Sequence, residues 1–305
     1  MRLFENADYS LVSSRRIGYI ISGTLLAVSI LSLLVRGLAL GIDFRGGFEF
    51  VVGNMGDVET VEVRSALTGP LGGQPEVKTF GETSLLIRAS VEGDEANTTE
   101  VQNLILSTIQ EQFPEANPEM EKTSVVGPRF AEDLRQGAIY AIFGALAVIF
   151  LYILVRFEWR YSVGAVAALV HDVTITLGLF SILAGVVPFS LQIDQGIIAA
   201  FLTIVGYSLN DTVVVFDRVR EYVNLFKTEN FPSIVNKSIN ATLSRTVVTS
   251  VTTLIVVTVL FIFGSEVLRG FSFALIFGVI IGTYSSIFVA SPTIVELNRR
   301  LEQPA

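Results

Sequence analysis

Six apolar segments, each about 20 residues long, restrict the possible folds of this chain more than any other feature of its sequence. A helix of that length crosses about 30 Å of hydrocarbon and satisfies its backbone hydrogen bonds internally. The segments are residues 17–35, 137–155, 161–183, 193–215, 246–263 and 271–290. Because 51% of the 305 residues are hydrophobic and 16% are charged, the chain is also too apolar for an ordinary soluble protein. The sequence predicts a polytopic membrane protein with six transmembrane helices.

The first apolar segment has a second interpretation, because Arg15 and Arg16 precede it as in secretory or twin-arginine signals. The segment is long for the apolar region of a signal, and no clear small-x-small cleavage site follows it before Asp43. We therefore expect an uncleaved first helix.

Basic residues around the segments predict their orientation, because short cytoplasmic loops are enriched in Lys and Arg. Four regions have this enrichment: residues 1–16, the connection between the second and third segments, the loop 216–245, and residues 291–305. We expect these regions on the cytoplasmic side, together with both termini. Their basic residues are Arg2, Arg15, Arg16, Arg156, Arg160, Arg218, Arg220, Lys227, Lys237, Arg245, Arg299 and Arg300.

Residues 36–136 form a connection long enough to be a domain, with 17 acidic and 8 basic side chains. Strands are predicted in FEFVVG, EVKTFG, TSLLIRAS and MEKTSVVGP, and helices in DVETVEVRSALTG and EANTTEVQNLILSTIQEQF. The order strand, helix, strand, strand, helix, strand is the split βαβ arrangement of ferredoxin-like domains. One membrane crossing separates this connection from the N-terminus, which is expected in the cytoplasm. The α+β domain between the first and second helices is therefore predicted on the periplasmic side.

The composition excludes several kinds of site. The chain has no cysteine and one histidine, His171, so disulfides, thiolate metal sites and His-rich metal clusters are excluded. The sequence GYSLN is not the G-x-S-x-G elbow of hydrolases, because Asn210 stands where that motif has its second glycine. We expect no enzyme activity and no metal.

Polar residues inside the apolar segments indicate where a function lies. Asn210 and Asp211 lie in the fourth segment, and Arg245 lies where the fifth begins. A charged Asp in hydrocarbon costs roughly 2.5 to 3.5 kcal/mol on insertion scales. In a structural interpretation, Asp211 reaches the interface or bonds a neighbouring helix. In a functional interpretation, it alternates between ionised and protonated forms, and a nearby Arg245 favours the ionised form. Tyr207 and Ser208 share its helix face and are candidates to hydrogen-bond it or to hold water.

Other positions in or next to the apolar segments also have polar or small side chains. His171 and Asp172, in the third segment, leave open both interhelical hydrogen bonding and a role in a proton path. Asp217 follows the fourth segment and is expected at a solvated helix end. The sequence GVIIG, residues 278–282, matches the GxxxG packing motif without indicating a particular partner helix.

The sequence GIDFRGG, residues 41–47, joins the first helix to the predicted outer domain. Gly46 and Gly47 permit backbone angles that other residues resist, so a tight turn or close packing is expected there. We treat Gly41, Asp43 and the glycine pair as a structural motif. A phosphate-binding loop is not expected, because no Lys-Ser/Thr pair follows.

Several motifs resemble those of SecF subunits in the SecD/SecF family, within the resistance-nodulation-division superfamily. In chain order they are GIDFRGG, VGP before the second helix, RFEWR after it, LVHD in the third, VGYSLNDTVVVFDRVRE in the fourth and LSRTVVTSVTT into the fifth. The fourth-helix motif is the most specific, and together the motifs run through nearly the whole chain.

The resemblance implies a subunit that works with SecD and couples the proton-motive force to late steps of Sec-dependent protein translocation. The implied partners are SecD, the Sec channel and the translocating unfolded polypeptide, with no nucleic acid. The implied location is a bacterial-type cytoplasmic (inner) membrane, and protons are the implied coupling ion, with no other cofactor. Asp211 and Arg245, with Asn210 beside them, are implied members of a proton-responsive seam. Ser244 stands before Arg245 where many relatives have His, and the principal proton-carrying aspartate is implied in SecD.

Two other functions are weighed against this one. The first is a half-transporter of the same superfamily that exports small lipophilic solutes, although a full exporter is expected to have two large outer domains and this chain has one. The second is a scaffold that holds SecD in the translocon, which predicts that charge-neutralising variants keep their activity.

Overall fold

The computed structural model describes residue 4 and residues 7–73, 75–81, 83–89, 97–187 and 189–302. The remaining residues include parts of the predicted cytoplasmic termini, the end of the predicted strand TSLLIRAS and the start of the predicted helix that follows it, and these lie outside the described residues. The chain divides into a helical unit, Met1–Leu38, Ala141–Ala184 and Gly196–Ala305, and a sheet unit, Ala39–Tyr140 and Gly185–Gln195.

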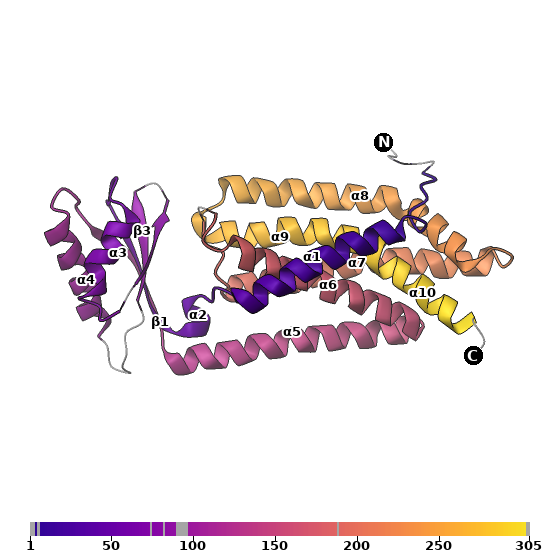
Figure 1. The fold of residues 1–305 in the computed structure, drawn as a ribbon, viewed down its shortest axis with the longest axis horizontal. Helices are drawn as coiled ribbons and strands as arrows, with labels where there is room; N and C mark the ends of the chain where they lie inside the picture. Colours follow the sequence, from indigo (N-terminus) through magenta and orange to yellow (C-terminus); the bar gives the residue numbers. More distant parts are fainter. Residues whose placement is uncertain are drawn as a thin grey trace. The chain divides into compact units, whose positions relative to one another are not determined.

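Long apolar helices make up the helical unit (Figure 1). They are α1 (Arg15–Val35), α5 (Pro128–Arg156), α6 (Trp159–Leu183), α7 (Gln195–Leu225), α8 (Phe231–Phe263) and α9 (Glu266–Ser285), the last continued by the π-helical turn η1 (Ser286–Ala290) and by α10 (Ser291–Glu302). The first part of α5, up to Tyr140, belongs to the sheet unit. In the described part of the chain, six helical runs are long and apolar enough to cross a membrane. The chain is therefore a polytopic membrane protein, as the hydropathy pattern predicted.

The helices continue beyond the predicted membrane spans. Most of the predicted loop 216–245 is helical, because α7 ends at Leu225 and α8 begins at Phe231. The turn between them is fixed by Asn230, whose side chain accepts a hydrogen bond from the Ser233 backbone N–H at 2.9 Å, and by a proline in the first turn of α8. Polar residues after an apolar segment do not end a helix unless such a signal follows.

Burial divides the membrane helices into a central group and an outer group. Half of the apolar window of α6 is buried, whereas 6% of that of α5 is. The faces of α1, α5 and α8 therefore present apolar side chains outward, which a hydrocarbon environment tolerates and water does not.

Glycines allow the central helices to approach one another closely. A Cβ on Gly178 of α6 would lie 2.2 Å from the Cβ of Ser29 in α1. A Cβ on Gly278 would lie 2.3 Å from the Ile204 side chain, and one on Gly282 would lie 2.9 Å from the Ser208 Cβ. The GVIIG motif of α9 therefore packs against α7, the partner that the sequence did not indicate.

The sheet unit has the predicted element order. After the one-turn helix α2 (Ile42–Arg45) come β1 (Gly47–Gly53), α3 (Thr60–Thr68), β2 (Glu76–Phe80), β3 (Ser84–Ala89), α4 (Thr98–Gln112) and β4 (Glu119–Val126). The four strands pair antiparallel in the order β2-β3-β1-β4. Both helices lie on one side of the sheet (Figure 1), where Phe50 and Ile87 pack with Ile105 and Ile109.

The GIDFRGG segment forms the turn into β1. Gly46 has φ 75° and Gly47 has φ 120°, which are values that favour glycine. A Cβ on Gly46 would also lie 3.2 Å from the Val126 carbonyl oxygen. Within the same unit, Asp43 Oδ2 accepts a hydrogen bond from the Gln195 backbone N–H at 3.1 Å. The helix α2 is an addition that the sequence did not predict.

Charged residues near the start of β2 hold a carboxylate in its ionised form. Burial raises the pKa of Glu76, but the hydrogen bond and charge of Lys78, the charge of Arg88 and a hydrogen bond from Gln192 outweigh burial, so the pKa lies below its usual value. The Lys78 Nζ to Glu76 Oε1 distance is 2.6 Å. Arg88 also pairs with Glu49 at 2.7 Å.

We expect Gly178→Ala to lower the free energy of unfolding by about 1–3 kcal/mol, because the added methyl group meets Ser29 backbone and side-chain atoms. Thermal unfolding in lipid or detergent measures the change. Gly23→Ala is the control, since Gly23 lies on α1 with nothing within 4 Å of its Cβ position. Equal stability of the two variants would contradict this packing.

We expect Glu76→Gln to weaken the sheet unit at neutral pH and to have less effect in acid. A carboxyl whose pKa is lowered by folding contributes stability above its unfolded value, 4.5, and loses it as the pH falls through the folded value. Because Glu76 is partly exposed, the effect should stay below about 1 kcal/mol. Hydrogen exchange of β2 and β3 amides at pH 7 and pH 3 measures it. Glu111→Gln, on an exposed residue of α4, should show no such pH-dependent difference.

Candidate functional site

Asp172 of α6 is the centre of a buried set of hydrogen bonds, and its side chain is 1% exposed. Its Oδ1 lies 2.9 Å from His171 Nδ1. Its Oδ2 accepts hydrogen bonds from the hydroxyls of Ser208 at 2.6 Å and Ser285 at 2.7 Å. Such short O–H···O distances are typical of charged acceptors. One carboxylate therefore connects α6 with α7 and α9.

The hydrogen bonds continue through His171 to the first helix. His171 Nε2 lies 3.1 Å from Ser22 Oγ of α1, and that oxygen lies 3.1 Å from the hydroxyl of Tyr284 in α9. The Tyr284 hydroxyl donates to the Gly18 carbonyl at 2.9 Å. We refer to the connected side chains as the Asp172 network, whose members are Asp172, His171, Ser22, Tyr284, Ser208 and Ser285.

The local sequence explains why the network forms. Consecutive residues of a helix point about 100° apart, so His171 and Asp172 are both buried only because α6 is packed on several sides. Gly282 lacks the side chain that would meet Ser208, which lets the Ser208 hydroxyl approach the carboxylate. Ser285 sits at the end of α9, directly before the π-helical turn.

Asp211 is a second buried carboxylate, three residues after Ser208 on α7, and it is 3% exposed. Its Oδ2 is buried without a hydrogen-bond partner in the described part of the chain. Arg245 is exposed but interacts electrostatically with Asp211. The ion pairs found among the described residues do not join these two side chains. Asp211 is thus buried inside the helical unit, and Arg245 acts on it electrostatically without a direct ion pair among the described residues.

The other polar residues that the sequence singled out differ in their partners and in their exposure. Tyr207 donates to Ser250 at 3.3 Å and Ser208 donates to Asp172, so these hydroxyls bond other side chains, and their expected alternative role of holding water stays a prediction. Both turn toward α8 or α6, where hydroxyl and carboxylate acceptors lie. Asn210 is exposed. Asp217 is 59% exposed and pairs with Arg156 at 3.0 Å, as expected of a solvated helix end.

Sequence reasoning missed three members of the network: Ser22, Tyr284 and Ser285. Each is an uncharged polar residue in an apolar helix, and such residues are common in membrane helices where they bond backbone carbonyls. The available signal was the buried acid of the third segment, which requires donors from its neighbours. Sequence alone does not say which helices supply them.

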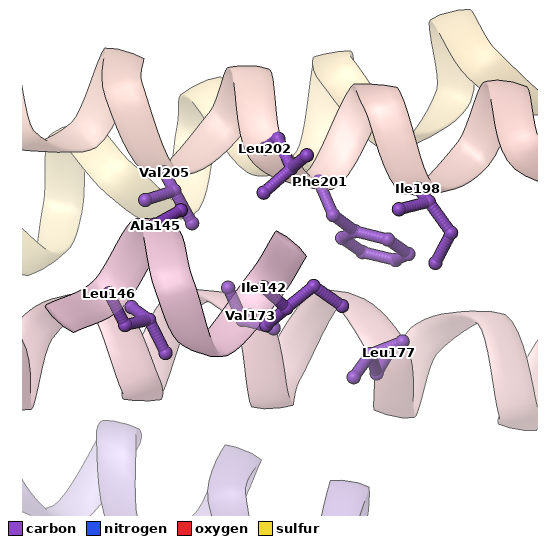
Figure 2. A pocket seen from close by; sticks show the side chains of 9 residues that line it. All are labelled: Ile142, Ala145, Leu146, Val173, Leu177, Ile198, Phe201, Leu202 and Val205. Atoms are coloured by element: carbon purple, nitrogen blue, oxygen red, sulfur yellow. The ribbon is translucent and has the colours of Figure 1, made fainter. Parts of the chain in front are cut away.

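An apolar pocket, lined by neither carboxylate, lies between α5, α6 and α7 (Figure 2). Its space is about 390 Å³, part of it open to the surroundings. The lining residues are Ile142, Ala145, Leu146, Val173, Leu177, Ile198, Phe201, Leu202 and Val205. In the described residues no group of three or more His, Cys, Asp or Glu side chains is placed to hold a metal ion.

Membrane-spanning helices around two buried carboxylates define the class: a polytopic membrane protein with ionisable groups inside its helical unit. Residues 106–300 match the family described as protein export membrane protein SecD/SecF, C-terminal, and the chain belongs to this family.

Relatives cover nearly the whole chain. It is 63% identical to the protein translocase subunit SecF of Rhodothermus marinus over 98% of this chain and 96% of that one. It is 45% identical to the SecF subunit of Desulfurispirillum indicum, over 93% and 90% of the two chains. The structure resembles the crystal structure of SecDF, a translocon-associated membrane protein from Thermus thermophilus, with a TM-score of 0.85 and 34% identity. That likeness covers 98% of this chain but only 40% of the longer SecDF chain.

We expect Asp172→Ala to destabilise the helical unit by about 3 kcal/mol or more, because it leaves buried hydroxyl and imidazole groups without their acceptor. Thermal unfolding in lipid measures the loss. Asp217→Ala removes an acid of the same type whose ion pair is exposed, and it should cost no more than about 1 kcal/mol. Similar losses in the two variants would contradict the central position of Asp172.

Proposed function

We propose that this chain is a SecF-type subunit that couples the proton-motive force to protein translocation across the cytoplasmic membrane. The observation that carries the proposal is 63% identity, over nearly its full length, to a protein named as a translocase subunit. The buried carboxylates add the chemistry that proton coupling requires. The chain acts by conformational change, not as an enzyme, with protons as the coupling ion and no other cofactor.

The chain works with a SecD partner in this proposal. The solved SecDF chains are much longer, and this chain corresponds to 40% of each of two of them. A separate SecD subunit supplies the remainder, including the principal proton-carrying aspartate. The complex binds the Sec channel and acts on the unfolded polypeptide that passes through it.

The orientation follows from the basic residues. The Arg and Lys residues of 1–16, the α5–α6 connection, 216–245 and 291–305 lie in the cytoplasm, because such residues resist translocation. The sheet unit, a ferredoxin-like domain by its element and strand order, then lies in the periplasm. It is the part of the chain that meets the exported polypeptide.

Asp211 responds to protons in this proposal, with Arg245 and Asn210 as the neighbouring members of the seam. The buried Oδ2, which has no hydrogen-bond partner among the described residues, supports this role, because protonation would remove a net charge from an apolar interior. One charge that crosses 100 mV gains roughly 2.3 kcal/mol, which is close to the roughly 2.5 to 3.5 kcal/mol cost of inserting a charged Asp. Proton flow therefore has enough energy to shift the packing of helices around α7.

Asp211→Asn and Arg245→Met should each sharply reduce the proton-gradient-stimulated part of export in membrane vesicles that contain SecD and the channel. Asp217→Asn is the matched control, because Asp217 is exposed near the end of the same helix. Stimulation that survives unchanged in both seam variants would refute proton coupling through this seam and favour the scaffold.

Co-purification distinguishes export from solute transport. A SecF-type subunit should be recovered with SecD and the Sec channel, and a half-transporter for lipophilic solutes should not. The apolar pocket does not by itself favour the transporter, because its lining offers no group that selects a solute.

A further inference from the structure

His171 is held so that one of its nitrogens is ready to accept a proton. The Asp172 carboxylate faces Nδ1 at 2.9 Å, and its other oxygen accepts hydrogen bonds from Ser208 and Ser285. A carboxylate oxygen with two hydroxyl donors is stabilised in the ionised form. The ionised carboxylate in turn keeps a proton on Nδ1, as in other carboxylate–imidazole pairs. The lone pair of neutral His171 is therefore on Nε2.

The Nε2 side has a complete set of hydrogen bonds whether or not a proton is bound. In the neutral state, the Ser22 hydroxyl donates to Nε2 across 3.1 Å. In the protonated state, Nε2–H donates to Ser22, Ser22 donates to the Tyr284 hydroxyl, and Tyr284 donates to the Gly18 carbonyl. Only the Ser22 hydroxyl must rotate between the two states. No buried donor loses its acceptor, which is the usual cost of placing a charge in an apolar interior.

Side chains from α1, α6, α7 and α9 surround the pair of His171 and Asp172. On its own helix the titratable neighbour is Asp172, and α9 contributes Tyr284, whose ring stacks 6.1 Å from the imidazole. From α7 comes Ser208, with Asp211 three residues further along, while α1 presents Ser22. The turn η1 has no titratable residue. The pair of neutral His171 and ionised Asp172 has a net negative charge, which proton uptake cancels.

We propose that His171 is a proton-binding site of the helical unit, in which a proton from solution adds to Nε2 and forms an imidazolium paired with Asp172. The bonds Nε2–H and Nδ1–H then tie α6 to α1 and to its own carboxylate at the same time. As a step of proton-coupled export the site rests on the function proposed above. As a proton-binding site it does not rest on that function. Spectroscopy therefore tests proton binding by His171, and export assays test the proposed function, and either result can be negative without the other.

The chain's single histidine makes the test specific. The full-length protein, labelled with ¹⁵N-histidine and purified with a tag that lacks histidine, is placed in lipid bilayers and equilibrated between pH 9 and pH 4. Solid-state NMR should show a neutral ring protonated on Nδ1 at high pH and an imidazolium at low pH. A ring that keeps one protonation state throughout, or a neutral ring protonated on Nε2, would overturn the proposal.

Variants separate the specific site from general loosening of the helices. Ser22→Ala removes the acceptor of Nε2–H and should weaken proton binding about tenfold, because a hydrogen bond to a charged group is lost. Ser32→Ala is the control, since the Ser32 hydroxyl pairs with Ser181 at 2.8 Å across the same α1–α6 contact without meeting His171. It should change proton binding less than twofold. Equal effects of the two variants would overturn the assignment of Ser22.

Tyr284→Phe tests the last hydroxyl of the chain of hydrogen bonds. It keeps the ring that stacks on His171 but removes the acceptor for the Ser22 hydroxyl. Proton binding should weaken, by less than in Ser22→Ala, because Nε2–H keeps its direct acceptor. An unchanged titration in Tyr284→Phe would show that Ser22 does not pass its hydrogen bond to Tyr284, and would overturn the protonated arrangement.

Discussion

The structure depends on a carboxylate that is almost completely buried. Asp172 lies inside an apolar helical unit, where an ionised group without partners would cost several kcal/mol. Donors on α6, α7 and α9 supply the hydrogen bonds that the carboxylate needs. Because Ser208 and Ser285 lie on other helices than Asp172, α7 and α9 cannot shift relative to α6 without breaking a short hydrogen bond. The hydrophobic effect does not hold helices together in lipid, because lipid chains are as apolar as the side chains. Close packing at glycines and the hydrogen bonds to Asp172 select the helix arrangement instead.

Asp172 and Asp211 illustrate two uses of the same side chain. Both are almost completely buried, and both lie in membrane helices. Asp172 has a donor at each oxygen, whereas Asp211 keeps one oxygen without a partner in the described residues. A fully bonded carboxylate holds one arrangement, while an incompletely bonded one gains from a proton or from a new contact. Under the proposed function, the first gives the unit its rigidity and the second its response.

Much of the fold was accessible from sequence, because apolar length fixes membrane helices and strict alternation fixes strands. The six helical runs and the order of the sheet unit follow from these two patterns. The buried acids were also recognised, since charge in an apolar segment stands out. Their partners were not: whether Ser208 bonds Asp211 on its own helix or Asp172 on another depends on helix rotation and on the space left by Gly282. Those are properties of packing between distant segments, which local spacing does not determine. The sequence did not predict that α7 and α8 continue past the membrane spans. Hydropathy identifies only the apolar part of a helix, and not the polar turns that extend it.

The π-helical turn after α9 has a geometric effect on the rest of the chain. It contains one residue more than an α-helical turn, so every side chain after it is rotated by about 100° from the position that an uninterrupted helix would give it. Ser285, before the turn, and Ile294, after it, would lie about 180° apart on an uninterrupted helix, whereas the extra residue reduces this angle to about 80°. Ser285 can therefore bond Asp172 while Ile294 packs on Gly164 of the same helix, α6. The number of residues in this turn, and not only their identity, determines which side of α10 meets the bundle.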